Sequence, residues 1–200
     1  MYAVKKTGEK LLSKKIKSKY GSIKDVEYFS SKDILYGTSS NLYRIKKNKY
    51  YEISSDRVTA IQIDNKKNVW IGGLRGVKKY FTKTDKLVNL DIKELNDAKI
   101  NDINFFESLV YFATDFGIYI YDKEINEIIK IINENDQLIS NQCKRIVFID
   151  NYLWVGTNSG ISRIELTHDG KSINKISNFS RSHGLISNFI NDLLIMNDTV

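Results

Sequence analysis

Few residues of this sequence have types and spacings suited to catalysis. Three carboxylates that could act as general acids or bases, Asp56, Asp115 and Asp136, lie far apart, and nothing in the sequence pairs them across a substrate. The two histidines are isolated: His168 lies in a turn-forming "THDG" stretch, and His183 precedes an apolar segment. Such histidines are typical of loops, because a metal site needs several ligands at defined spacings. The sequence therefore predicts no catalytic residue, no metal site and no cofactor.

Thiol and phosphate-loop chemistry are equally poorly supported. Cys143 is the single cysteine, so no internal disulfide can form, and its place at the start of an apolar stretch predicts a buried thiol. There is no Walker-type phosphate loop and no nucleophile elbow. One stretch, "NYLWVGTNSGISRI" (151–164), carries Gly156 and Gly160 at a spacing that fits either a binding loop or the turn of a hairpin. The rest of the chain decides between them.

The same pattern occurs four times. Each copy has apolar and aromatic residues, a small residue, a short loop, a glycine or asparagine and then an alternating strand; the copies are "ILYGTSSNLYRI" (34–45), "VWIGGLRGVKKY" (69–80), "VYFATDFGIYIY" (110–121) and "LWVGTNSGISRI" (153–164). The small residues recur every 35 to 43 positions, at Gly37, Gly72, Ala113 and Gly156. Such a period is typical of the four-stranded blades of a β-propeller.

The flanks of the copies repeat as well. An apolar or alternating stretch precedes each copy and another follows it, which predicts four antiparallel strands, A to D, joined by hairpins. The B–C turn then needs a residue that accepts positive φ, which explains the glycine or asparagine there: Asn41, Gly76, Gly117 and Gly160. The small residue ending strand B leaves room for the adjacent blade. The aromatic before it is expected to pack between blades: Tyr36, Trp70, Tyr111 and Trp154.

These motifs resemble the two-component-regulator propeller repeat. The matching segments are "NDQLISNQCKRIVFIDNYLWVGTNSGISRI" (135–164), "DRVTAIQIDNKKNVWIGGLRGVKKY" (56–80) and "SHGLISNFINDLLIMNDTV" (182–200), whereas the 26–45 and 100–121 copies depart from the pattern. Repeats of this family build the periplasmic sensor regions of bacterial hybrid histidine kinases. The resemblance implies an extracytoplasmic, non-enzymatic sensor that dimerises in its full-length form.

The repeats divide the chain into about four complete blades and two partial ones. The expected class is all-β, a partial propeller of four-stranded antiparallel blades; the expected segments are the end of a blade (1–16), four blades (23–53, 56–92, 99–132 and 143–179) and the start of another (188–200). The chain is therefore expected to be a piece of a larger propeller. In a five-blade ring, the two ends would share one blade, but that blade would lack strand B.

The candidate ligand-binding residues lie in the loops that a propeller presents at one face. The D–A and B–C loops surround the mouth of the central channel in this fold. Their polar and aromatic residues suit a small polar ligand or an oligosaccharide: Arg57, Arg75, Lys99, Asp115, Phe116, Asn141, Asn158, Ser159 and Asn188. Ser-Asn before a strand is also a turn signature, so a structural role stays open for these residues.

Charge and hydropathy limit the classes of partner that the chain is expected to bind. The formal net charge is +7, but the lysines alternate with acidic residues and asparagines, which favours a solvated surface and no nucleic-acid partner. No run of about twenty apolar residues exists, so a membrane contact is expected only through segments outside the chain. A ligand sensor is the leading hypothesis; a propeller enzyme resembling the streptogramin lyases and a protein-interaction scaffold are the alternatives.

Overall fold

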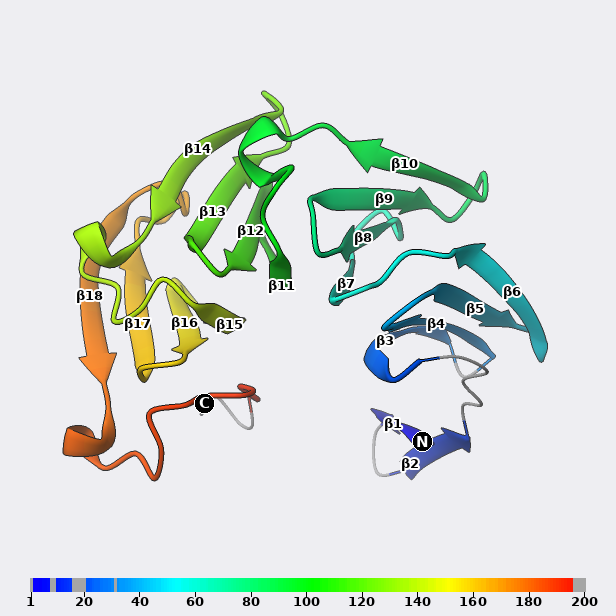
Figure 1. The fold of residues 1–200 in the computed structure, drawn as a ribbon, viewed down its shortest axis with the longest axis horizontal. Coiled ribbons are helices and arrows are strands. Elements are labelled where there is room, and N and C mark those ends of the chain that lie inside the picture. Colours follow the sequence, from blue (N-terminus) through cyan, green and yellow to red (C-terminus); the bar gives the residue numbers. More distant parts are fainter. Residues whose placement is uncertain (1, 8–9, 16–20, 31, 196–200) are drawn as a thin grey trace. The chain divides into compact units, whose positions relative to one another are not determined.

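A computed structural model describes residues 2–7, 10–15, 21–30 and 32–195 of the chain, with side chains from residue 21 onward (Figure 1). The chain divides into two compact units, the first made of Met1–Gly73 with Lys78–Val88 and the second of Leu74–Val77 with Asn89–Val200. Among the described residues, no helix has the length and apolar character needed to cross a bilayer.

Four sheets of four antiparallel strands account for most of the described chain (Figure 1). In every sheet the strands pair in the order in which they follow one another along the sequence. This arrangement confirms the predicted all-β class with four-stranded antiparallel sheets. The first sheet contains β3 (Ile23–Ser30), β4 (Asp33–Thr38), β5 (Leu42–Lys46) and β6 (Lys49–Ser54), and the second contains β7 (Ala60–Ile63), β8 (Val69–Gly72), β9 (Val77–Phe81) and β10 (Lys86–Leu90).

The other two sheets belong to the second unit. The third sheet contains β11 (Ile100–Phe106), β12 (Leu109–Thr114), β13 (Gly117–Asp122) and β14 (Glu127–Ile132), and the fourth contains β15 (Cys143–Ile149), β16 (Tyr152–Thr157), β17 (Ile161–Leu166) and β18 (Ile173–Phe179). A hairpin of β1 (Tyr2–Thr7) and β2 (Lys10–Lys15) precedes the first sheet. Short 3-10 turns lie in the connections between sheets and near the C-terminus: η1 (Lys93–Leu95), η2 (Glu134–Asp136) and η3 (Arg181–His183).

Residues 188–195 form no strand, although the sequence predicts the first strand of a further blade from residue 188; residues 196–200 of that predicted segment lie outside the described part of the chain. A strand needs a ladder of backbone partners, and here Ile190 donates its N–H to the carbonyl of Thr157 at 3.0 Å, with no further ladder. Residue 1, residues 8–9 and residue 16 of the predicted 1–16 segment also lie outside the described part.

In each unit a hydrophobic core cluster lies between the two four-stranded sheets. In the first unit, Leu35 of β4 packs with Ile61 of β7 and Ile71 of β8 in one buried cluster. In the second unit, Tyr111 and Ile120 of the third sheet pack with Val155 of β16. Alternation places every second side chain of a strand on this face, so the strands present one apolar face to the neighbouring sheet.

The glycines that end strand B fit the predicted close approach. A Cβ on Gly37 would lie 2.3 Å from Cγ1 of Val58, and one on Gly156 would lie 2.7 Å from Cγ2 of Ile190. Both distances are too short for a real contact. Bare backbone at these positions therefore lets the segment that follows the sheet lie directly against it.

The turn residues behave as predicted in three copies and differently in the fourth. Gly76, Gly117 and Gly160 have left-handed backbones, with φ of 69°, 115° and 141°. Asn41 does not have a positive φ. The Asn41 N–H instead binds Oγ1 of Thr38 at 2.8 Å, while its side-chain amide binds Glu52, so this turn is closed by hydrogen bonds without a left-handed residue.

The aromatic residues of strand B lie on two different faces. Tyr111 is buried between the third and fourth sheets, where its ring meets that of Phe148 edge-on at 4.9 Å. Trp154 instead stacks on Phe179 of its own sheet at 5.9 Å. Tyr36 is one residue closer to the conserved turn than the other aromatics, and since side chains alternate across a strand it faces away from the core that contains Leu35. Tyr36 therefore does not pack against the second sheet, and its buried ring stacks on that of Tyr43 in its own sheet, with the ring centroids 5.3 Å apart.

Candidate functional site

The first strand of a sheet lies beside the first strand of the next sheet within each unit, and a β-bulge shapes it. In the first unit β3 lies beside β7, and in the second β11 lies beside β15. The register shifts between Ile23 and Asp25, between Ile100 and Asp102, and between Cys143 and Arg145. A bulge inserts one unpaired residue and turns the neighbouring side chains away from the regular alternation.

The bulged aspartates join neighbouring sheets. Asp25 accepts a hydrogen bond from the N–H of Val26 at 2.8 Å with Oδ1 and one from the N–H of Ile61, on β7, at 2.7 Å with Oδ2. Asp102 makes the same pair of bonds in the second unit, with Ile103 at 3.0 Å and Ile146 at 2.9 Å. Each carboxylate thus satisfies two backbone donors, one in its own strand and one in the next sheet.

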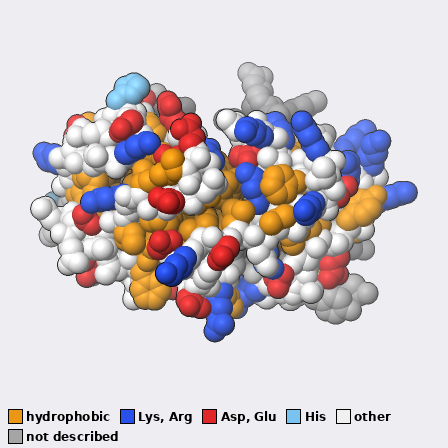
Figure 2. All heavy atoms as spheres, turned by 90° about the horizontal axis from the view of Figure 1, so that it is seen from above, with side chains coloured by type: hydrophobic (Ala, Val, Ile, Leu, Met, Phe, Trp, Pro, Cys, Tyr) orange, Lys and Arg blue, Asp and Glu red, His pale blue; other side chains and the backbone are white. Residues whose placement is uncertain are grey.

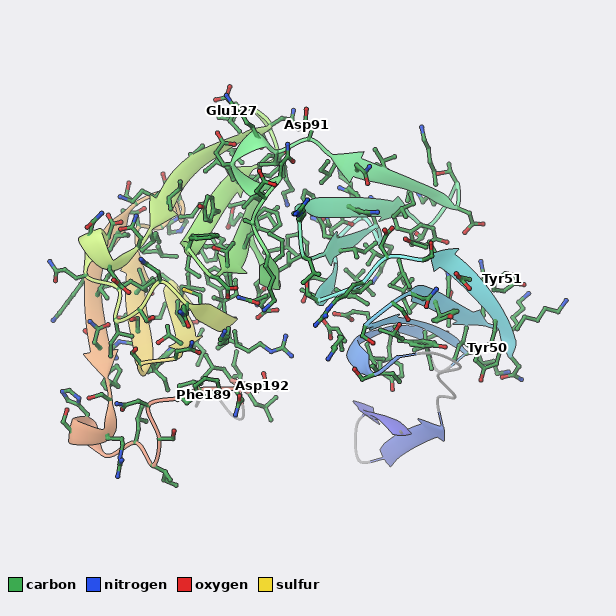
Figure 3. All side chains as sticks on the ribbon, viewed as in Figure 1. Tyr50, Tyr51, Asp91, Glu127, Phe189 and Asp192 are labelled. Atoms are coloured by element: carbon green, nitrogen blue, oxygen red, sulfur yellow. The ribbon has the colours of Figure 1, made fainter. Side chains whose placement is uncertain are left out.

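Arg145 occupies the corresponding position of the fourth sheet and links two carboxylates. Its Nη1 lies 3.2 Å from Oδ1 of Asp102, and its Nε lies 2.7 Å from Oδ1 of Asp192, which Figure 3 labels on the C-terminal segment. A cation at this position replaces the aspartate of the first and third sheets. In the second unit, the cation of Arg145 therefore lies between the carboxylates of Asp102 and Asp192.

Buried threonines close the B–C turns and fix their tips. The hydroxyl of Thr114 donates to the carbonyl of Gly117 at 2.9 Å and accepts the N–H of Phe116 at 2.9 Å. Thr157 does the same for Gly160, at 2.8 Å. Both threonines are fully buried, so the exposed residues between them and the glycines project from a rigid base.

Two predicted site residues of the second unit, Asp115 and Asn158, belong to one group of polar side chains. We call this group the rim cluster, and it comprises Asn101, Asp115, Gln142, Lys144 and Asn158. Oδ1 of Asp115 accepts from Nδ2 of Asn101 at 2.7 Å and lies 3.7 Å from Nζ of Lys144. Nδ2 of Asn158 donates to Oε1 of Gln142. Because Gln142 and Lys144 flank Cys143, the B–C turns of the third and fourth sheets meet at the start of β15.

Aromatic and hydroxyl groups border the rim cluster. Phe116 follows Asp115 in the same turn and is 60% exposed. Ser159 is exposed beside Asn158. An exposed ring next to amide, carboxylate and ammonium groups is the combination with which proteins hold the apolar face and the hydroxyls of a sugar.

Asn141 and Asn188 are engaged in closing loops. Oδ1 of Asn141 accepts the N–H of Glu134 at 2.8 Å, and Oδ1 of Asn188 accepts the N–H of Arg181 at 2.7 Å. Each bond joins two residues that are seven positions apart, one pair around η2 and the other around η3. This repeated geometry favours the turn role of the Ser-Asn pairs at both positions.

The remaining predicted site residues are not joined to the rim cluster by any described contact. Arg75 is exposed in the turn before β9, and Lys99 is partly exposed before β11. Arg57 is exposed but belongs to the first unit. Sequence reasoning missed Asn101 and Lys144 as members of the cluster, because both are bulge residues and a bulge leaves no signal in the alternation of the strand.

The carboxylates and the thiol that could take part in catalysis are held in structural contacts or buried. Asp56 pairs with Lys78 at 2.5 Å and with the hydroxyl of Ser54, and the Lys78 bond holds the pKa of Asp56 below its usual value. Asp136 binds Lys130 at 3.0 Å. Burial raises the pKa of the Cys143 thiol to about 12. The thiol is therefore protonated at neutral pH.

No protein-family model matches the chain, and no curated protein matches it. Among solved structures, the extracellular domain of a hybrid two-component system of B. thetaiotaomicron, BT3049, is similar with a TM-score of 0.72 and 18% identity, over 87% of this chain and 24% of that one. YCF48 bound to D1 peptide is similar with a TM-score of 0.60 and 12% identity, over 91% of this chain and 61% of that one. An ancestral GH74 enzyme is similar with a TM-score of 0.54 and 14% identity, over 76% of this chain and 23% of that one.

These comparisons concern the fold. The chain spans about a quarter of the length of the sensor domain that it matches. The three similar proteins differ in their described roles, so at these identities the likeness carries the architecture alone. The four consecutive four-stranded sheets and these matches together identify the chain as an all-β protein with part of a β-propeller fold.

Proposed function

We propose that this chain is a ligand-sensing part of an extracytoplasmic β-propeller and that it transmits binding to a two-component output without catalysing a reaction. The observation that carries the proposal is the similarity to the extracellular domain of a hybrid two-component system, the highest TM-score among the three structures compared above. The repeat motifs support it independently, since the sequence resembles the same class of sensor.

The rim cluster is the proposed ligand site. Asp115, Lys144 and Asn158 supply a carboxylate, an ammonium and an amide on rigid turns, and Phe116 supplies an exposed ring. Hydrogen-bonding groups beside a ring suit an oligosaccharide, for which ring stacking on an aromatic side chain adds to the hydrogen bonds. Binding signals only if the ligand has different affinities for the two signalling states of the propeller.

Isothermal titration of the chain against a panel of neutral and charged oligosaccharides tests the ligand class. We expect one oligosaccharide class to bind, and Phe116→Ala to weaken it about five- to tenfold through loss of ring contact. Ile125→Ala is the matched control, because Ile125 is 56% exposed in the C–D turn at the other end of the same sheet. Equal weakening by both variants, or no heat from any oligosaccharide, would contradict the rim site.

The alternative functions give different results in the same assay. If the bound oligosaccharide were cleaved, as the GH74 likeness suggests for an enzyme, the non-catalytic proposal would be wrong. Binding of peptides in place of sugars would favour a scaffold, in line with the likeness to YCF48 bound to a peptide. For the output, the coding sequence continuous with this chain is expected to encode further blades, a membrane span and a kinase; a reading frame without an output domain would contradict a sensor.

A further inference from the structure

A pocket lies wholly within the first unit. Its volume is about 610 Å³, within the range of small-molecule sites. It is formed between the first and second sheets by the C–D hairpin of the first and the C–D strands of the second, lined by Arg44, Lys46, Lys47, Lys49, Tyr51, Glu52, Ile53, Tyr80, Asp85 and Leu87. All of these residues belong to the first unit, so the pocket shares no residue with the rim cluster, which belongs to the second unit.

The inner wall of this pocket is rigid. Arg44 is buried and forms a bidentate pair with Asp33, at 2.8 Å for both nitrogen–oxygen contacts. Its Nη1 donates to the hydroxyl of Tyr80 at 3.1 Å, and that hydroxyl donates to Asp85 at 2.6 Å. The charge of Arg44 is therefore balanced within the protein, and the network fixes the Tyr80 ring as part of the wall.

The opening of the pocket carries excess positive charge. Lys46, Lys47 and Lys49 are exposed on one four-residue hairpin, and no described carboxylate lies within ion-pair distance of their ammonium groups. Of the two carboxylates that line the pocket, Glu52 accepts from Asn41 at 2.8 Å and Asp85 accepts from Tyr80. Within the described part of the chain, the three ammonium groups thus have no carboxylate partner, and they outnumber the two carboxylates of the pocket lining that they face.

The hairpin that carries these lysines has a charge pattern and a backbone conformation that are unfavourable for its residue types. Lys46 and Lys49 are directly opposite one another on β5 and β6, and like charges at such positions are destabilising. Lys47 occupies a left-handed turn position with φ of 50°, where glycine, asparagine or aspartate is usual. A turn that is unfavourable in both charge and conformation favours a role in binding, since residues that break local rules cluster at functional sites.

The pocket also has an apolar part. Tyr51 is 48% exposed, and Ile53 and Leu87 are half-buried beside it. Tyr50 precedes Tyr51 on β6 and is 52% exposed, but it does not line the pocket (Figure 3 labels both). The pocket therefore joins an apolar surface to a cationic opening.

We propose that this pocket binds an anionic ring compound, whose ring lies on Tyr51 and Leu87 and whose carboxylate or phosphate pairs with Lys46, Lys47 and Lys49. Binding brings an opposite charge between lysines that otherwise repel one another, and it removes apolar surface from water. The shared chemistry is a ring that carries an anionic group. An acidic sugar and an aromatic acid both have it, and the test separates them.

The test is isothermal titration of the chain with four probes at low and high salt: galacturonic acid trimer, its neutral galactose counterpart, phenyl phosphate and inorganic phosphate. An acidic sugar ligand predicts binding of the galacturonic acid trimer alone, and an aromatic acid ligand predicts binding of phenyl phosphate alone. We expect the affinity for the binding probe to fall with salt. Binding of the neutral sugar with equal affinity, binding of inorganic phosphate as tightly as the ring probes, or no binding of any probe would overturn the proposal.

Matched variants assign the binding to this pocket. Replacing Lys46, Lys47 and Lys49 by Gln should weaken binding at least about tenfold, whereas the same replacement at three exposed lysines of other turns in the first unit, Lys66, Lys67 and Lys83, should not. Tyr51→Ala should weaken ring binding and Tyr50→Ala should not. Equal effects of the two triple variants would show attraction to the net charge alone and overturn the proposal. Phe116→Ala should leave this binding unchanged, which separates its outcome from that of the rim site.

Discussion

Oδ2 of Asp102 accepts the backbone N–H of Ile146 at 2.9 Å, which joins the first strand of the third sheet to the first strand of the fourth. Asp25 makes the equivalent bond to Ile61 in the first unit. The repetition shows that the aspartate after the bulge is a joint between neighbouring sheets. The stability of each unit should therefore depend on this side chain more than on other acidic residues.

Asp102→Ala should lower the free energy of unfolding by about 2 to 4 kcal/mol, because it leaves the buried Ile146 N–H without a partner and removes one carboxylate from Arg145. Urea unfolding followed by circular dichroism measures the loss. Asp97→Ala is the control, since Asp97 is exposed between η1 and β11. Equal changes in the two variants would show that the joint contributes nothing beyond a surface charge.

Gly37→Ala should destabilise the first unit by about 1 to 3 kcal/mol, because the added Cβ would lie 2.3 Å from Val58. The second variant Val58→Gly removes Cγ1 and Cβ of Val58, which would lie 2.3 and 2.5 Å from the added Cβ, at the cost of its own packing. If the clash is the cause, the double variant should be more stable than the sum of the single losses predicts, by at least about 0.5 kcal/mol. Additive losses, measured by denaturant unfolding, would place the cause elsewhere.

Asp122 should contribute a pH-dependent part of the stability. Its side chain lies 2.8 Å from Nζ of Lys171, and this bond, with the N–H of Glu124, lowers the pKa of the carboxyl below 3.8. A lowered pKa in the folded state means that the stabilisation is present above the unfolded value and is lost as the pH falls through the folded one. The free energy of unfolding should therefore differ less between pH 6 and pH 3 for Asp122→Asn than for the unchanged chain. Lys171→Gln should reduce the difference as well; an unchanged difference in both would contradict the pair.

Cys143 should resist thiol reagents in the folded chain. The residue is fully buried, and burial raises its pKa to about 12, so almost no thiolate forms at neutral pH. Labelling with an aromatic disulfide should proceed only with unfolding. Ser159→Cys in the Cys143→Ala background is the positive control, because Ser159 is exposed at a turn tip. Rapid labelling of Cys143 in the folded protein would contradict its burial.

Periodicity in the sequence predicts the sheets because period-two alternation and a recurrent Gly-Thr turn are local signals. Gly117 and Gly160 have the left-handed backbone that the pattern indicates, whereas Asn41 does not, although the hydroxyl of Thr38 donates to the carbonyl of Asn41 as the other threonines do in their turns. The strand expected from residue 188 is absent from residues 188–195, since pairing depends on a partner that lies elsewhere in the chain.

The candidate sites were harder to predict than the sheets. Asp115, Phe116 and Asn158 could be assigned to a loop face from the order of strands, but Asn101 and Lys144 join them through bulges that alternation does not reveal. The pocket of the first unit depends on how two sheets pack against each other. No stretch of sequence indicates that Lys49 and Leu87 line one cavity, because they are brought together only by that packing.

The joints made by Asp25 and Asp102 end on backbone N–H groups and not on side chains. Every amino acid except proline offers that donor, and the sequence contains no proline. The receiving positions, Ile61 and Ile146, can therefore be substituted without removing the joint. A duplicated copy could diverge at those positions and still attach to its neighbour, which gives such a protein a route to lengthen by tandem duplication.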